Sequence, residues 1–224
     1  MGKLYIIATP IGNLEDITLR SLRILKEVDL VLCEDTRQTK KLLDRYEIKT
    51  LTLSYHQHSK MQKVDQIIEL LRSGKKLALV SDAGTPAISD PGGKLVEEVL
   101  RTFGDEAEII PIPGPTAVAA AASVSGFPTD KFLFLGFPPH KHGRAAFFKK
   151  INTAEETVIF YESTHRILKS LEELKNVAGE RQIVVCRELT KMFETIYRGT
   201  AGEVLEKLKS DTTKGEFVVA VRNK

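Results

Sequence analysis

Short apolar runs alternate with longer amphipathic segments through the first half of this chain. Four of the runs, at residues 4–8, 30–34, 77–81 and 108–112, lack the alternation of inward and outward side chains that a half-exposed strand shows. Strands of that kind are covered by helices on both faces of their sheet. The pattern therefore predicts an α/β fold.

Capping signals predict helices between these strands. Asp16 is expected to cap a helix that carries leucines at three-residue spacing from Leu19, and Asp90 to cap another that begins at Pro91. Two further helices are expected at residues 37–46 and 61–72.

The pattern in the second half of the chain predicts another arrangement of α/β layers, in which strands follow one another more closely than in the first half. Strands are expected at residues 132–137, 157–161, 183–187, 195–199 and 216–221, and helices near 143–150, 163–176 and 202–210. This close succession favours a mixed sheet over a purely parallel one. A length of 224 residues suits two domains, which we expect at residues 1–114 and 115–224.

Composition excludes several classes of protein. With 42% hydrophobic and 28% charged residues, the chain can bury a core and is not disordered. Its two cysteines, Cys33 and Cys186, are far apart, which excludes a disulfide framework and a cysteine-built zinc site and favours the cytoplasm. No apolar run approaches membrane-spanning length, so no membrane partner is expected.

Positive charge is concentrated in the second half. The net charge of +3 is the sum of −2 over residues 1–130 and +5 over residues 131–224, which permits an anionic partner there. Residues 140–150 hold four cations and no acid, and they also hold two phenylalanines, which are either core residues or rings for stacking RNA bases. The residues expected to contact RNA are Lys141, Arg144, Phe147, Phe148, Lys149 and Lys150.

Three loops rich in glycine and proline follow predicted strands, at residues 8–13, 81–93 and 111–117. The longest, residues 81–93, holds Gly84, which lets the backbone approach a ligand; the alternative is a turn that only caps a helix. Loops at the carboxyl ends of neighbouring strands would line one crevice. None carries a dinucleotide or P-loop motif, so nicotinamide and nucleoside-triphosphate functions lose support.

These loops, together with residues 33–37 and 126–128, resemble the tetrapyrrole methylase family of S-adenosylmethionine-dependent methyltransferases. Residues 55–58, 161–166 and 186–191 resemble the branch of that family that methylates ribosomal RNA. The resemblance implies two α/β domains of the tetrapyrrole methylase type with the cofactor in the interdomain cleft. It also implies a homodimer that 2′-O-methylates a cytidine of 16S rRNA, in a 30S particle or in free RNA.

The resemblance also implies the cofactor-binding residues, position by position. They are Pro10 on the cofactor side after the first strand, Gly84, Thr85 and Ile88 in the loop that flanks the methionine part, Thr116 and Ala117 after the Pro-Gly turn of the third loop, and Tyr161, Leu189 and Gly215 around the adenosine. Asp82 is added because an acidic group suits the positive sulfur of S-adenosylmethionine. Members of the branch often continue past the final strand, so any RNA contact of such an extension is expected to be absent or supplied elsewhere.

A ribose hydroxyl is a weak nucleophile, so a base must remove its proton or a cation must stabilise the alkoxide. Candidates are the pair Glu188 and Lys191 and the pair Glu162 and His165, each after a predicted strand. The alternatives are an ordinary ion pair and a helix-start histidine. The set Glu34 to Arg37 suits substrate positioning or an ion pair better than a base.

Other readings stay open at this point. No metal is expected, because the histidine pairs His56 with His58 and His140 with His142 each lack a third ligand. Cys186 lies in a predicted strand, which suits a buried thiol. Two further functions remain possible for such a chain: methylation of a tetrapyrrole, and a non-catalytic cofactor-binding or ribosome-assembly module.

Overall fold

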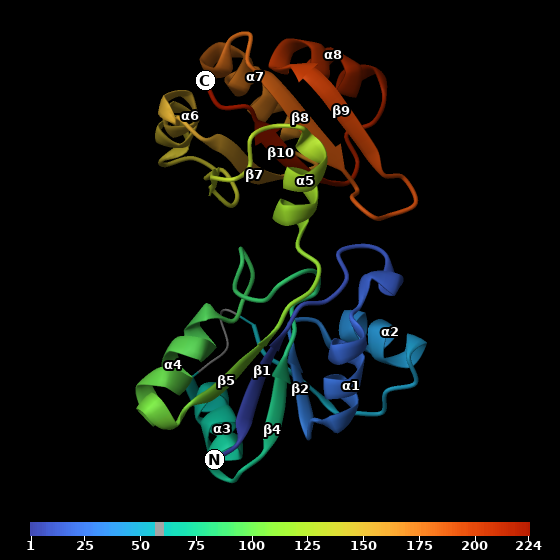
Figure 1. Ribbon diagram of the computed structural model, residues 1–224, viewed down its shortest axis with the longest axis vertical. Coiled ribbons are helices and arrows are strands. Elements are labelled where there is room, and N and C mark those ends of the chain that lie inside the picture. The colour runs from blue at the N-terminus through green and yellow to red at the C-terminus, as the bar shows by residue number, and fades with distance from the viewer. Residues whose placement is uncertain (57–60) are drawn as a thin grey trace. The chain divides into compact units, whose positions relative to one another are not determined.

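The computed structural model describes residues 1–56 and 61–224 (Figure 1). The chain divides into two compact units, Met1–Thr116 and Ala117–Lys224. Each unit is built around one five-stranded sheet with helices against it, which confirms the predicted α/β class.

The sheet of the first unit is entirely parallel. Its strands, in spatial order, are β3 (Thr52–Ser54), β2 (Leu30–Cys33), β4 (Lys76–Leu79), β1 (Lys3–Ile7) and β5 (Glu108–Ile112). The sequence predicted all of these except β3, whose three residues are too few to form a recognisable apolar run.

Helices cover both faces of this sheet, as the uniform apolar strands predicted. One face packs against α1 (Leu19–Glu27) and α2 (Thr36–Arg45), and the other against α3 (Met61–Arg72) and α4 (Gly93–Phe103) (Figure 1). Alternate residues of β2 serve the two cores, because Val31 packs towards α1 and Leu32 towards α3.

Two predicted helix caps are wrong. Asp16 lies in a short 3-10 helix, Leu14–Asp16, and α1 is capped instead by Thr18, whose hydroxyl accepts from the amide of Ser21 at 3.1 Å. Asp90 does not cap α4, which begins at Gly93 without a side-chain cap. In both places the chain uses an extra turn before the helix, so the first acidic residue lies too early to reach the free amides.

The second unit has the mixed sheet that the close strand spacing predicted. Its order is β6 (Phe132–Phe134), β7 (Thr157–Ser163), β10 (Glu216–Val221), β8 (Gln182–Arg187) and β9 (Thr195–Thr200). Only β6 and β7 pair in parallel, and the other neighbours are antiparallel.

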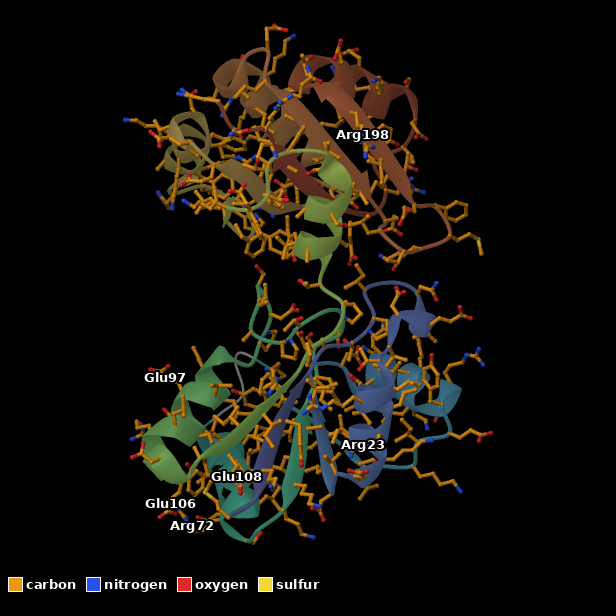
Figure 2. All side chains as sticks on the ribbon, in the orientation of Figure 1. Arg23, Arg72, Glu97, Glu106, Glu108 and Arg198 are labelled. Atoms are coloured by element: carbon orange, nitrogen blue, oxygen red, sulfur yellow. The ribbon has the colours of Figure 1, made fainter. Side chains whose placement is uncertain are left out.

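Four helices complete the second unit. One face of the sheet packs against α6 (Arg144–Thr153), α7 (Ile167–Ala178) and α8 (Ala201–Ser210), and the other against α5 (Ala117–Ser125). Arg198 on β9 (Figure 2) donates to the carbonyl of Val124, near the end of α5. Among the described residues, no helix is long and apolar enough to cross a membrane.

Candidate functional site

The topology of the first unit makes the carboxyl end of its sheet a candidate ligand site. Strands β1 and β4 are neighbours, yet the chain leaves β1 towards α1 on one face and leaves β4 towards α4 on the other. Ligands of open α/β sheets bind at such a switch point, beyond the carboxyl ends of the strands. The predicted loops at residues 8–13 and 81–93 begin here.

These two loops are joined by main-chain hydrogen bonds. The amide of Thr9 donates to the carbonyl of Gly84 at 2.9 Å, and the amide of Gly84 donates to the carbonyl of Thr9 at 3.0 Å. The Thr9 hydroxyl also donates to the carbonyl of Ser81 at 3.1 Å. Pro10 is therefore held in a buried position directly after the bridge.

The third loop joins them through Thr85. Its hydroxyl donates to the carbonyl of Pro115 at 3.2 Å, next to Thr116. Gly84 has a φ of +81°, and a Cβ there would lie 3.4 Å from Ile11 Cγ2 and 3.8 Å from the Pro115 carbonyl oxygen. The loops after β1, β4 and β5 thus pack together around Gly84, whose left-handed backbone favours glycine.

The loop at residues 81–93 is held in an unusual backbone conformation. Besides Gly84 and Gly92, Ala87 and Ser89 have left-handed φ angles of 72° and 61°. Of the five left-handed non-glycine residues in the described chain, two lie here and two more, Glu188 and Thr190, lie after β8. Such conformations concentrate at ligand-binding loops, where the surrounding structure maintains them. Ile88, between two of them, is 38% exposed.

Carboxylates gather where β2 and β4 end. Asp82 Oδ1 accepts from the amide of Asp35 at 3.0 Å, and Asp35 pairs with Arg37, which lowers the pKa of Asp35 to about 2. Burial raises the pKa of Glu34, the nearby Asp82 raises it further, and His56 opposes the rise. The set Glu34 to Arg37 is therefore tied to Asp82, a predicted cofactor residue.

In the second unit, three predicted cofactor residues share one apolar cluster. Ala117, Tyr161 and Leu189 are partly buried together on the α5 face of the sheet. The Tyr161 ring makes edge contacts with Phe134 and Phe137, at centroid distances of 4.9 and 5.5 Å. The Tyr161 hydroxyl accepts from the amide of Val118 at 3.2 Å, which ties the ring to the first turn of α5.

Glu188, Lys191 and Gly215 meet at the edge of the second sheet where β8 ends and β10 begins. Glu188 Oε1 accepts from Lys191 Nζ and from the amide of Glu216, both at 2.9 Å. A Cβ on Gly215 would lie 2.6 Å from Glu188 Cγ, so only glycine fits there. This packing places the Glu188 carboxylate on the main chain that opens β10.

The electrostatics of this pair keep both groups charged. Burial opposes ionisation of Glu188, but its bonds from Lys191 and the Glu216 amide prevail and lower its pKa. Burial likewise opposes the charge on Lys191, but the carboxylates of Glu188 and Glu216 prevail and raise its pKa. A carboxylate with a lowered pKa is a weak base, and an amine with a raised pKa stays protonated and cannot accept a proton, so the pair suits electrostatic stabilisation better than proton removal.

Glu162 and His165 lie in contrasting surroundings. Glu162, at the end of β7, is 1% exposed and is bound by two arginines and two serines. His165 lies in the following turn and is exposed. The Glu162 carboxylate is enclosed and cannot contact a substrate, whereas the His165 imidazole is exposed and can.

Three of the six residues that were predicted to contact RNA belong to the core of the second unit instead. Arg144 is 6% exposed and pairs with Glu173 at 2.8 Å, while Phe148 is 3% exposed and Phe147 packs beside it in the α6 core. The sequence could not show this, because the carboxylates that pair with Arg144 come from two other elements, β7 and α7. Three of the predicted cations remain exposed, namely Lys141, Lys149 and Lys150.

Both cysteines are buried, and burial raises the pKa of Cys186 to about 11. His140 and His142 are exposed, and His58 of the segment at residues 55–58 lies outside the described residues. Within the described part of the chain, no group of three or more His, Cys, Asp or Glu side chains is placed to hold a metal ion.

Sequence reasoning missed several residues that hold the site loops. Buried Arg187 donates to the carbonyls of Lys214 at 2.6 Å and Phe193 at 3.1 Å, and so joins the loop that ends at Gly215 to the loop that follows β8. Thr164 exchanges hydrogen bonds with the main chain of Gly215. Both residues stand in motifs that the sequence had singled out, but their partners lie 27 and 51 residues away.

Comparison with known proteins identifies the family to which these loops belong. The family model described as Tetrapyrrole (Corrin/Porphyrin) Methylases matches residues 3–205. This chain belongs to that family. The predicted resemblance is thereby confirmed over most of the sequence, including all three strand-end loops of the first unit.

Curated relatives of this tetrapyrrole methylase narrow the comparison. A Thermotoga maritima protein named Ribosomal RNA small subunit methyltransferase I is 44% identical over 224 residues, covering all of both chains. A protein of the same name from Escherichia coli O157:H7 is 47% identical, covering 98% of this chain and 77% of its own. The solved structure of a cobalt precorrin-4 methyltransferase shares the fold, with a TM-score of 0.71 at 21% identity over 98% of this chain and 94% of that one.

Proposed function

We propose that this chain is an S-adenosylmethionine-dependent methyltransferase that modifies small-subunit ribosomal RNA. The observation that carries the proposal is the 44% identity to the Thermotoga maritima relative over the full length of both chains. The left-handed residues in the loops after β4 and β8 support it, because such backbone conformations concentrate at ligand-binding loops.

The residues present fit S-adenosylmethionine, which supplies a methyl group bound to a positively charged sulfur. The first-unit loops pack closely around Gly84, where a Cβ would contact Ile11 and Pro115, and Thr85 and the exposed Ile88 follow in the same loop. Asp82 supplies a negative charge near that loop. We assign Pro10, Gly84, Thr85, Ile88 and Thr116 to the methionine side.

The second unit offers the apolar surface that an adenine ring requires. We assign this role to Ala117, Tyr161 and Leu189, which share one cluster, with Gly215 at the neighbouring edge. Methyl transfer is an in-line displacement, so holding the two reactants in line can lower the barrier by about 7–11 kcal/mol. Residues that only orient the reactants can therefore supply much of the rate.

For the acceptor we propose the 2′-hydroxyl of a cytidine in 16S rRNA. Lys191 keeps its ammonium charge, and we assign it to stabilising the negative charge that develops on the ribose oxygen. Glu188 holds that ammonium in place from 2.9 Å. His165, which is exposed after β7, is the group we assign to contact the RNA.

We further propose that the protein acts as a homodimer in the cytoplasm and that its substrate is the RNA in a 30S particle. The three exposed lysines Lys141, Lys149 and Lys150 support an RNA contact on the second unit, which carries the chain's positive charge.

Transfer of a labelled methyl group tests this function against the two alternatives. Protein and methyl-labelled S-adenosylmethionine are mixed in parallel with unmethylated 30S particles, with free 16S rRNA and with uroporphyrinogen III. Label in 30S particles or in rRNA supports the proposal. Label in the tetrapyrrole alone, or cofactor binding without transfer to any acceptor, would contradict it.

A further inference from the structure

Glu162 lies at the centre of a buried cluster of charges in the second unit. Its carboxylate is within 3.0 Å of Arg166 Nε and 3.9 Å of Arg144 Nη1, and its own side chain is fully buried. It also accepts from the amide of Ser163 at 2.7 Å and from the hydroxyl of Ser170. Glu173 completes the cluster by pairing with Arg144 at 2.8 Å.

Each arginine of the cluster also holds a main-chain carbonyl of the loop between β6 and α6. Arg166 Nη1 donates to the carbonyl of Pro138 at 2.8 Å, and Arg144 Nη1 donates to that of Pro139 at 3.3 Å. Proline has no amide hydrogen, so this stretch cannot be fixed by its own donors. The two guanidinium groups hold it instead, and Glu162 lies between them.

This loop contributes one residue, Phe137, to the proposed cofactor site. Phe137, directly before the two prolines, makes an edge contact with Tyr161 at 5.5 Å. Phe137 is 48% exposed, so its position depends on the backbone that follows it more than on a surrounding core. Tyr161 itself is bound to the loop through its amide, which donates to the carbonyl of Gly136 at 2.9 Å.

We propose that Glu162 is a positioning residue: through Arg144 and Arg166 it fixes the loop at residues 136–143, so that Phe137 stays against Tyr161 and the adenosine side of the site is formed. The inference rests on the proposed function, since it assumes that Tyr161 faces the cofactor. It gives Glu162 a different role from the catalytic one that its place in the sequence suggested.

The chemistry of the cluster agrees with this role. Two carboxylates and two guanidinium groups balance each other in charge, and the donors around Glu162 occupy its oxygens. A proton acceptor needs a free oxygen at the substrate, which this carboxylate lacks. Buried ion pairs often add little net stability over apolar packing, although removing one partner is costly because it leaves the other charge unpaired.

The test compares Glu162→Gln with the control Glu173→Gln. Glu173 pairs with Arg144 as well but is 31% exposed and does not contact Arg166. For E162Q we expect the Kd for S-adenosylmethionine, measured by calorimetry without RNA, to rise about tenfold, and kcat at saturating cofactor to fall less than about threefold. Hydrogen exchange at residues 136–143 should quicken in E162Q and stay near the wild-type rate in E173Q.

Three results would overturn the inference. One is a large loss of kcat in E162Q with an unchanged cofactor Kd, which is the signature of a catalytic group. Another is wild-type exchange and affinity in E162Q, and the third is an equal effect in both variants. If E162Q does not fold, Arg166→Lys replaces it, because lysine keeps the charge but not the bond to Pro138, and the same readouts apply.

The proposed function can fail separately from this inference. A wild-type protein that binds S-adenosylmethionine but methylates no RNA would contradict the function, while the exchange and affinity measurements on E162Q would still decide the role of Glu162.

Discussion

Thr9 and Gly84 exchange a reciprocal pair of main-chain hydrogen bonds, at 2.9 and 3.0 Å, between loops whose strands are adjacent in the first sheet. The bridge joins the loops after β1 and β4 at the point where the chain turns from these two strands to opposite faces of that sheet. It fixes the buried Gly84 where a Cβ would lie against Ile11 and the Pro115 carbonyl, and this placement leads to the first prediction.

Replacing Gly84 with valine should weaken S-adenosylmethionine binding by about tenfold or more, because a Cβ would enter the space between Ile11 and Pro115. Gly74→Val is the matched control. Gly74 has a similar φ of +86° but nothing within 4 Å, and it lies at the other end of β4. Both variants should lose similar stability from the left-handed backbone, about 1–3 kcal/mol. Equal cofactor affinity in the two, measured by calorimetry, would remove this loop from the site.

Lys191→Met should lower kcat by about 10²–10³, because the ammonium that stabilises the developing alkoxide is lost. Cofactor affinity should stay unchanged. The control is Lys209→Met on α8, where Lys209 forms a similar ion pair with Glu206 at the same spacing. A K191M enzyme with the wild-type kcat would show that the Glu188 and Lys191 pair is only structural.

The lowered pKa of Glu188 predicts a pH-dependent contribution to stability. The carboxylate is stabilised in the folded protein, so the contribution is present above the unfolded pKa of 4.5 and is lost as the pH falls through the lowered folded value. Urea unfolding of wild type and Glu188→Gln should therefore differ at pH 6, and the difference should shrink steadily below pH 4.5. A difference that grows on acidification would contradict the assignment.

The exposed lysines and the buried arginine of residues 140–150 should behave differently. Changing Lys141, Lys149 and Lys150 together to alanine should lower the salt slope of RNA binding by about 2, at about 0.7 for each phosphate contact on a single strand. An unchanged slope would show that these lysines face away from the RNA. Their exposure predicts no loss of stability.

Arg144→Ala should instead destabilise the fold by about 3–5 kcal/mol, because it leaves Glu162 buried with one cation fewer. Arg23→Ala is the control, since Arg23 (Figure 2) forms an exposed pair with Glu27 on α1 and should cost less than about 1 kcal/mol. Urea unfolding measures both. A small effect for Arg144 would show that the cluster carries little of the fold's stability.

Buried thiols should be inert in the folded protein. Burial raises the pKa of Cys186 to about 11 and also raises that of Cys33, so little thiolate exists at pH 8. A disulfide reagent at pH 8 should label neither cysteine in the native state and both in denaturant. Rapid labelling of a native thiol would contradict their burial.

Patterns along the chain predicted the strands and helices because apolar spacing is a local signal. They failed at Asp16 and Asp90, where a residue suited to capping lies before an extra turn, and at Leu19, which is 87% exposed despite its spacing. The site loops were found through their glycines and prolines. Left-handed backbone conformations occur at Ala87, Ser89, Glu188 and Thr190, and the types of these residues do not predict them.

Contacts between residues that are distant in sequence explain why two of the site predictions failed. Arg144 was predicted to meet RNA and Glu162 to take part in catalysis, because each stands in a suggestive motif. The structure places the two in one buried cluster, 18 positions apart in sequence and on adjoining elements. Only the fold shows that their charges face each other.

The central claim is that the acceptor is a cytidine ribose of small-subunit rRNA. It is tested most directly by digesting rRNA from methylated 30S particles to nucleosides and measuring them by mass spectrometry. We predict that 2′-O-methylcytidine appears only when protein and S-adenosylmethionine are both present, and that it is reduced with G84V. A methyl group on a base, or no gain of 2′-O-methylcytidine while the cofactor is bound, would contradict the claim.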